Sequence, residues 1–172
     1  MNEHAVIFED HCFYDPSQTQ YLFAIKEESD NSYIASIQNT NLFREHISDY
    51  LKLADYHVRL AVIMNNHNQP DTSLILCHRA LHSVLGAIYI QENRSLNVPY
   101  HFTMEEILRL VHVCSDSSRE LDIAIFIGTV QHLSEAGDRF EWDINGEQKE
   151  PVQKLIQRTK ETIEELSGYL LE

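Results

Sequence analysis

The residues best suited to chemistry lie in the middle of an otherwise apolar segment. Residues 78–83 (His-Arg-Ala-Leu-His-Ser) interrupt the apolar run between residues 70 and 93. At 100° per residue, a helix over this segment places His78 beside Leu81 and Leu85 and points it toward a core. The segment therefore combines the pattern of a buried helix with side chains that need polar partners.

Two interpretations of this polar cluster stay open. A buried guanidinium requires a partner, since an unpaired buried charge is strongly destabilising. In the first interpretation, His78, Arg79 and His82 line a polar pocket, at the bundle centre or at a dimer seam, that binds an anion such as phosphate. In the second, Arg79 pairs with Asp55 or Asp122, and the two histidines are hydrogen-bonded core residues.

The spacing of His78 and His82 raises two further kinds of chemistry. Histidines at i and i+4 share a helix face, as in zinc sites, but no HExxH or ExxH pattern supplies the remaining ligand, so neither a metal nor a cofactor is predicted. The sequence from His82 to Gly86 (HSVLG) also resembles the phosphorylatable histidine of phosphotransfer bundles. In those bundles a Lys occupies the position of Leu85 here, and it pairs with the phosphohistidine.

Nucleophilic catalysis has no motif in this sequence. There is no GxSxG, no Gly-rich phosphate loop, and Cys77 lies among apolar residues, where a thiol is ordinarily inert. The three cysteines are widely spaced, which indicates reduced thiols. The acidic start and the lack of a run of about 18–20 apolar residues predict neither a signal peptide nor a membrane span. We expect a cytoplasmic protein.

The charge of the chain restricts its partners. The net charge is −14; residues 1–40 hold seven acidic residues and one Lys, and residues 135–172 hold ten acidic and five basic residues. Residues 41–94 are balanced. Binding of nucleic acid by bulk electrostatics is therefore excluded, whereas a small, local anion site is compatible with the neutral middle of the chain.

Hydrophobic periodicity predicts an all-α fold, an antiparallel up-down bundle of four or five helices over residues 41–172. The expected helices cover residues 41–66, residues 70–93, residues 103–114 with a capping box from Thr103 to Glu106, a segment capped by Asp116 or Ser118, and the residues after Pro151. Asn145-Gly146 predicts a tight turn. Residues 1–40 form an appendage, either a small β-hairpin about residues 29–32 or an irregular helix.

Residues 54–111 resemble the HEPN family of small helical bundles. The resemblance is a pattern of packing residues in two helices and the Pro- and His-containing loop between them. The matching positions are Ala80, Leu81, Leu85, Ala87, Pro99, His101, Ile107 and Leu110.

This resemblance implies a homodimer, and many members act in toxin–antitoxin or defence systems. Some members are metal-independent RNases that carry an Arg, four to six residues, and then a His. Arg94 and His101 have six residues between them. In that mechanism His101 would act as acid and base, and Arg94 would stabilise the charge that develops on phosphorus.

Three hypotheses follow. The leading one is a HEPN-like, non-enzymatic module, a homodimer that binds a partner protein or a small nucleotide-like anion. The first alternative is a HEPN-type RNase that uses Arg94 and His101. The second alternative is a phosphotransfer bundle that uses His82.

Overall fold

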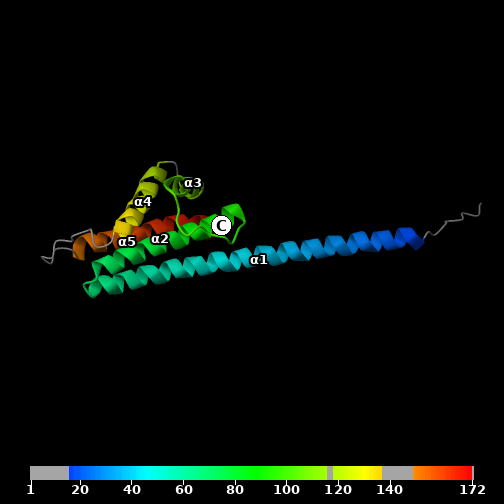
Figure 1. Cartoon of the computed structure of the whole chain (residues 1–172), viewed down its shortest axis with the longest axis horizontal. Coiled ribbons are helices and arrows are strands. Elements are labelled where there is room, and N and C mark those ends of the chain that lie inside the picture. The colour runs from blue at the N-terminus through cyan, green and yellow to red at the C-terminus, as the bar shows by residue number, and fades with distance from the viewer. Residues whose placement is uncertain (1–15, 116–117, 137–148, 172) are drawn as a thin grey trace, which may run out of the picture. The chain divides into compact units, whose positions relative to one another are not determined.

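The computed structural model describes residues 16–115, 118–136 and 149–171, and these are helical apart from short connections (Figure 1). The elements are α1 (Pro16–Asn66), α2 (Pro70–Asn93), α3 (Met104–Cys114), α4 (Glu120–Ala136), α5 (Lys149–Gly168) and the 3₁₀ turn η2 (Tyr169–Leu171). The predicted all-α class is confirmed. The turn predicted at Asn145-Gly146 lies outside the described residues.

The chain divides into two compact units, Met1–Thr40 and Asn41–Glu172. The β-hairpin interpretation of the first unit is wrong for residues 16–40, which are α-helical; residues 1–15 lie outside the described part. The expected turn at residues 29–32 contains neither Gly nor Pro, so no residue there is obliged to leave the helical conformation.

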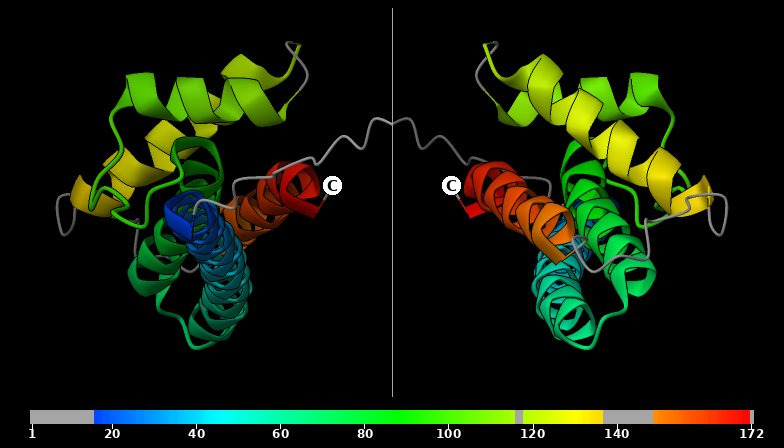
Figure 2. Two further views of the ribbon diagram at one scale, coloured as in Figure 1. Left: turned by 90° about the vertical axis from the view of Figure 1, so that its right-hand side faces the viewer. Right: turned by 90° about the vertical axis from the view of Figure 1, so that its left-hand side faces the viewer.

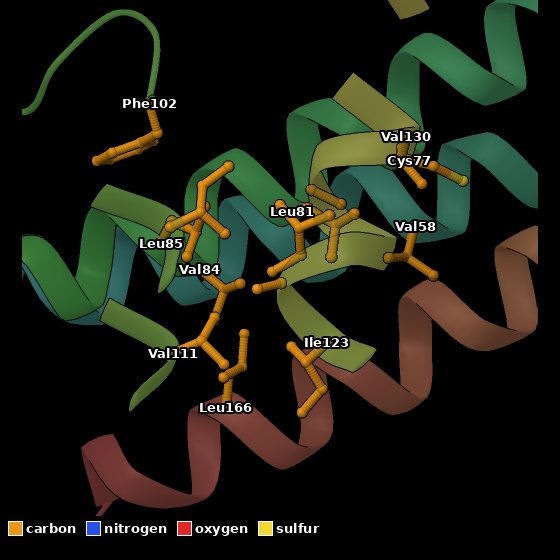
Figure 3. Close-up of a cluster of buried hydrophobic side chains, with 14 of the residues drawn as sticks. Val58, Cys77, Leu81, Val84, Leu85, Phe102, Val111, Ile123, Val130 and Leu166 are labelled. Atoms are coloured by element: carbon orange, nitrogen blue, oxygen red, sulfur yellow. The ribbon is translucent and has the colours of Figure 1, made fainter. Parts of the chain in front are cut away.

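Helix α2 forms the centre of this unit because it is apolar on nearly every side. Thirteen of its residues are buried, from Ser73 to Ile90. Leu81, Val84 and Leu85 lie at the middle of the cluster in Figure 3, and Val111 of α3 lies nearby. A helix without a polar face must be covered by its neighbours on most sides, and the other helices supply that cover.

Figure 2 shows α2, α5 and the second half of α1 nearly end-on, whereas α3 and α4 lie across the view. Asn65 at the end of α1 donates to Gln153 at the start of α5 (3.2 Å). Tyr169, just after α5, donates to Glu92 at the end of α2 (2.6 Å). Helices α2 and α5 therefore run parallel to each other, and both oppose α1.

Local signals account for most helix boundaries. Thr103 and Glu106 form the predicted capping box, with mutual side-chain-to-backbone hydrogen bonds. Arg94 ends α2 in the left-handed conformation (φ 48°), and its N–H donates to the carbonyl of Ile90. Helix α4 begins at Glu120, after Ser118, while Asp116 lies outside the described residues.

Gly86 allows α1 to lie close to α2. A Cβ atom at this position would come within 2.7 Å of the Tyr50 ring and 3.3 Å of Val98. The Gly of the HSVLG stretch is thus explained by packing between two helices, without reference to phosphotransfer.

Helix α2 departs from the expectation about membrane spans. Among the described helices, it is the one whose length and composition would suffice to cross a bilayer, but 72% of its most apolar window is buried inside the protein. A core helix that is covered on all sides has the same composition as a membrane span. This helix alone therefore says little about location.

Truncation of the core should separate buried from exposed positions. We expect Leu85→Ala, at a side chain that is 1% exposed, to lower the free energy of unfolding by about 2–5 kcal/mol because it leaves a cavity. Ile63→Ala, at a half-exposed side chain of α1, should cost less than about 1 kcal/mol. Urea denaturation followed by circular dichroism measures both; equal losses would contradict the described core.

Candidate functional site

A groove of about 730 Å³ opens where α1, α2, α4 and the loop before α3 meet. We call it the histidine groove, because four of its residues are histidines. Its lining consists of Tyr50, Leu53, His57, Ile75, His78, Arg79, His82, Ser83, Tyr100, His101, Ser134 and Glu135. Three residues predicted to form a ligand site, His78, Arg79 and His82, lie together in it, and His101 joins them.

Arg79 is exposed, not buried as the sequence suggested. Its expected carboxylate partners do not hold it: Asp55 pairs with Arg59, and Asp122 makes no ion pair within the described residues. The guanidinium of Arg79 likewise has no ion pair in the described part of the chain. The interpretation of Arg79 as a paired core residue is therefore wrong, and an unpaired cation lines the groove.

His57 on α1 lies near Arg79. Its Nδ1 atom is buried and has no hydrogen-bond partner. Burial lowers the pKa of His57, the nearby Arg79 guanidinium lowers it further, and the backbone carbonyl of Arg79 partly opposes the shift. An uncharged imidazole and a guanidinium thus face one end of the groove, and no carboxylate contributes to the pKa of this histidine.

His78 connects α2 to α4. Its Nδ1 lies 2.8 Å from the hydroxyl of Ser134, which in turn donates to the carbonyl of Gln131 at 2.8 Å. A hydroxyl carries one hydrogen, so with that hydrogen on the carbonyl the imidazole donates to Ser134. The pKa of His78 is lowered, first by burial and then by His82, and raised in part by Glu135.

His82 anchors the loop that precedes α3. Its Nε2 lies 3.1 Å from the carbonyl of Pro99 and must carry the hydrogen, since a carbonyl only accepts. Its ring centroid lies 5.0 Å from that of the fully buried Phe102. Burial lowers the pKa of His82, although the carbonyls of Pro99 and Tyr100 oppose the shift. The half-buried ring thus supports the loop with one of its two nitrogens.

The other end of the groove carries an acid. Glu135 Oε1 lies 3.2 Å from Nδ1 of His101, and the side-chain amide of Gln131 lies 2.9 Å from Nε2 of the same ring. Both nitrogens of His101 are therefore engaged. Next to it, Tyr100 is 98% exposed at the mouth of the groove.

Arg94 lies away from the groove. It caps the C-terminus of α2, twelve residues and hence about 18 Å along the helix from His82. Its charge lowers the pKa of Tyr169 slightly, while that pKa rises to about 12, chiefly through the hydrogen bond to Glu92. Within one chain, Arg94 and His101 do not form a pair, and their joint role as an RNase site stays a prediction.

The sequence analysis did not identify several lining residues. His57, Tyr50, Ser134 and Glu135 lie on α1 and α4, far in sequence from the histidine cluster of α2. The one usable signal is that His57 borders the apolar stripe of α1. Among the described residues, no group of three or more His, Cys, Asp and Glu side chains is arranged to hold a metal ion.

Comparison with known protein families, with curated proteins and with solved structures gives no match for this chain. The resemblance to the HEPN family therefore stays a prediction.

The groove should make stability depend on pH. The pKa values of His57, His78 and His82 are lowered below 6.5, so the unfolded chain binds protons before the folded chain does. The contribution of these three neutral histidines to stability is fully present above about pH 6.5 and is lost as the pH falls below that value. We expect the urea midpoint to decrease from pH 7.5 to pH 5.5.

Replacing these three histidines together with Gln should weaken that decrease. His67→Gln, at an exposed histidine after α1, replaces a histidine outside the groove and should leave the decrease intact. An equal effect of both substitutions would show that the groove does not cause the pH dependence.

Proposed function

We propose that the protein is a non-enzymatic binding module whose histidine groove takes a small, nucleotide-like anion. The observation that carries this proposal is the Arg79 guanidinium, which lines the groove without a carboxylate partner among the described residues. An unpaired guanidinium presents several fixed donors to a phosphate group. In a chain of net charge −14, such an isolated cation is a local exception to the surrounding field.

The rest of the lining suits the organic part of such a ligand. The side chains of Leu53 and Ile75 are apolar, and Tyr50 and Tyr100 offer aromatic surface on which a base can stack. At the far end, the Glu135 carboxylate accepts hydrogen bonds from amino or hydroxyl groups. The volume of about 730 Å³ falls within the range of about 300–1,000 Å³ that is usual for small-molecule sites.

Hydrogen bonding in the groove supports binding over group transfer. His78, His82 and His101 each use at least one ring nitrogen to hold another part of the protein. A phosphotransfer role for His82 remains an alternative that requires its second nitrogen to reach a phosphodonor. The RNase alternative requires Arg94 and His101 to meet across two subunits.

Adenosine 5′-monophosphate (AMP) is a direct probe of the proposal. We expect AMP to raise the melting temperature and to bind in calorimetry, with adenosine binding more weakly because it lacks the phosphate. Arg79→Gln should weaken AMP binding by roughly tenfold or more, since a hydrogen bond to a charged group contributes about 1.5–3 kcal/mol.

Arg109→Gln is the matched control. Arg109 is an exposed arginine of α3 outside the groove, and its loss changes the net charge by the same amount. Flat thermal and calorimetric responses to AMP would refute the proposal. Equal losses of affinity in both arginine variants would show that AMP responds to the net charge of the protein and not to a site at Arg79.

A second observation favours binding of a protein partner. One face of α4 is apolar but exposed: Leu121 is 58% and Ile125 is 50% exposed. Gly128 and His132 continue this face and line a smaller cavity of about 390 Å³. We propose that the face pairs with the same face of a second copy, which gives the homodimer.

Charge complementarity supports a second copy as the occupant. Asp122 lies five residues before residue 127 and His132 five residues after it, and both are exposed without an ion pair in the described part of the chain. In an antiparallel pair of α4 helices centred at that level, each Asp122 would lie at the border of the apolar face, at the same level as the partner's His132. An isologous interface requires this kind of self-complementarity.

Analytical ultracentrifugation over a range of protein concentrations tests the α4 pairing. We expect a concentration-dependent dimer that Ile125→Asp converts to monomer, because it places a charge at the centre of the apolar face. Ile63→Asp, at a similarly exposed isoleucine of α1, should leave the dimer intact. A chain that is monomeric throughout, or an equal effect of both variants, would contradict this interface.

A further inference from the structure

The arrangement of charge along the histidine groove implies more than a general affinity for anions. Arg79 and His57 lie at one end, where the guanidinium charge acts on the imidazole. His101 and Glu135 lie at the other end, joined by a 3.2 Å contact. His78 stands between the two ends, since the charges of both Arg79 and Glu135 act on it.

The groups that face the groove come from every element around it. They are Tyr50 and His57 from α1; His78, Arg79 and His82 from α2; Tyr100 and His101 from the loop; and Glu135 from α4. Arg79 is the single permanent cation among these lining residues, and Glu135 is the single carboxylate. An anion is therefore attracted to the Arg79 end and repelled from the Glu135 end.

One histidine nitrogen differs from the others. His78, His82 and His101 hold protein atoms through at least one ring nitrogen. The ring of His57 also interacts with the backbone carbonyl of Arg79, but its buried Nδ1 has no partner. A buried nitrogen without a hydrogen bond is costly. Because this atom is covered in the structure, a ligand oxygen in the groove reaches it only after the His57 ring turns about its side-chain bonds. Because it borders the same end as Arg79, His57 is well placed to become a second donor to a bound anion.

We propose that the groove binds a phosphate monoester as its dianion between Arg79 and His57, and that one proton from the solvent adds to the His57 imidazole on binding. This inference rests on the proposed anion-binding function and specifies its ligand and its regulation. No covalent bond forms: the proton leaves a buffer acid, adds to a free ring nitrogen, and the imidazolium donates a hydrogen bond to a phosphate oxygen.

Electrostatics gives the reason for proton uptake. In the empty groove, burial and the Arg79 charge both favour the neutral ring of His57. A dianion placed between the two side chains carries two negative charges. One is balanced by the Arg79 guanidinium, and the other is balanced when His57 becomes an imidazolium. By linkage, a ligand that favours the protonated ring binds more tightly as the pH falls.

Isothermal titration calorimetry with AMP measures the proton directly. In two buffers of different ionisation enthalpy, the difference between the observed heats gives the number of protons taken up. We expect an uptake of close to one proton at pH 7.5. The affinity should weaken by up to about tenfold per pH unit above the pKa of His57 in the unliganded protein. Measurements between pH 7 and pH 8.5 keep the phosphate largely dianionic, since its second pKa is about 6.

Inorganic sulfate separates the ligand from the protein as the origin of the effect. Sulfate does not titrate in this pH range, so any proton taken up with it must be bound by the protein. Inorganic phosphate and glycerol phosphate, tested beside AMP, distinguish recognition of the phosphate group alone from recognition of a nucleotide. We expect all three phosphates to show proton uptake, with AMP binding most tightly.

Two variants locate the proton. His57→Gln and His57→Asn should both keep measurable AMP binding, lose the proton uptake and show an affinity that no longer depends on pH. His67→Gln, outside the groove, should behave as the wild type. Unchanged uptake in the His57 variants, or AMP binding without uptake in the wild type, would overturn this inference while leaving the proposed binding function intact. Absence of AMP binding would overturn both.

Discussion

The structure of the second unit depends on the burial of α2 on nearly all of its sides. A helix with no polar face cannot lie at a surface, so α1, α3, α4 and α5 are arranged around it. Leu81, Val84 and Leu85 then have no contact with solvent beyond a trace. The polar residues of the same helix cannot be buried in that core, because the desolvation of an unpaired charge costs more free energy than the surrounding contacts supply.

The histidine groove is the result of this conflict. His78, Arg79 and His82 emerge where the neighbouring helices part, and each histidine finds a partner at the edge of the core: Ser134 for His78 and a loop carbonyl for His82. Arg79 extends into solvent instead of pairing. The polar residues that do not fit the core around α2 therefore line the groove. With apolar residues at these positions, α2 would contribute no polar groups to it.

The charge distribution accounts for the selectivity that we propose for the groove. The protein as a whole is strongly acidic, so long-range attraction of polyanions is not expected. At the scale of a single phosphate group, however, Arg79 and His57 dominate, because salt screens more distant charges beyond about 8 Å. A small ligand that reaches these two side chains experiences a local field that differs from the field of the whole surface.

Much of the fold could be predicted from local signals. The apolar pattern of residues 70–93 and the Thr103–Glu106 capping box predict their helices because both patterns involve neighbours in sequence. The helix over residues 16–40 was less predictable, since the sequence there has neither a clear stripe nor a strong breaker. Exposure of Leu121 and Ile125 was not predictable from periodicity, because α4 is apolar nearly all round and its outer face is set by tertiary packing.

The candidate site was predictable only in part. The cluster on α2 stood out because its polar residues interrupt an apolar helix, and spacing placed them on one side. His57, Ser134 and Glu135 come from helices whose register against α2 the sequence does not specify. The ion pair predicted for Arg79 was wrong because the sequence does not show which cation a carboxylate meets. Asp55, one of the expected partners, pairs with Arg59 on its own helix.

Binding of a phosphate group at the Arg79 end of the histidine groove underlies both ligand proposals. A crystal structure of the protein grown with AMP tests it most directly. We expect density for the phosphate within hydrogen-bond distance of the Arg79 guanidinium and the His57 ring, with the base toward Tyr100. AMP bound elsewhere on the chain, with water alone between Arg79 and His57, would contradict it.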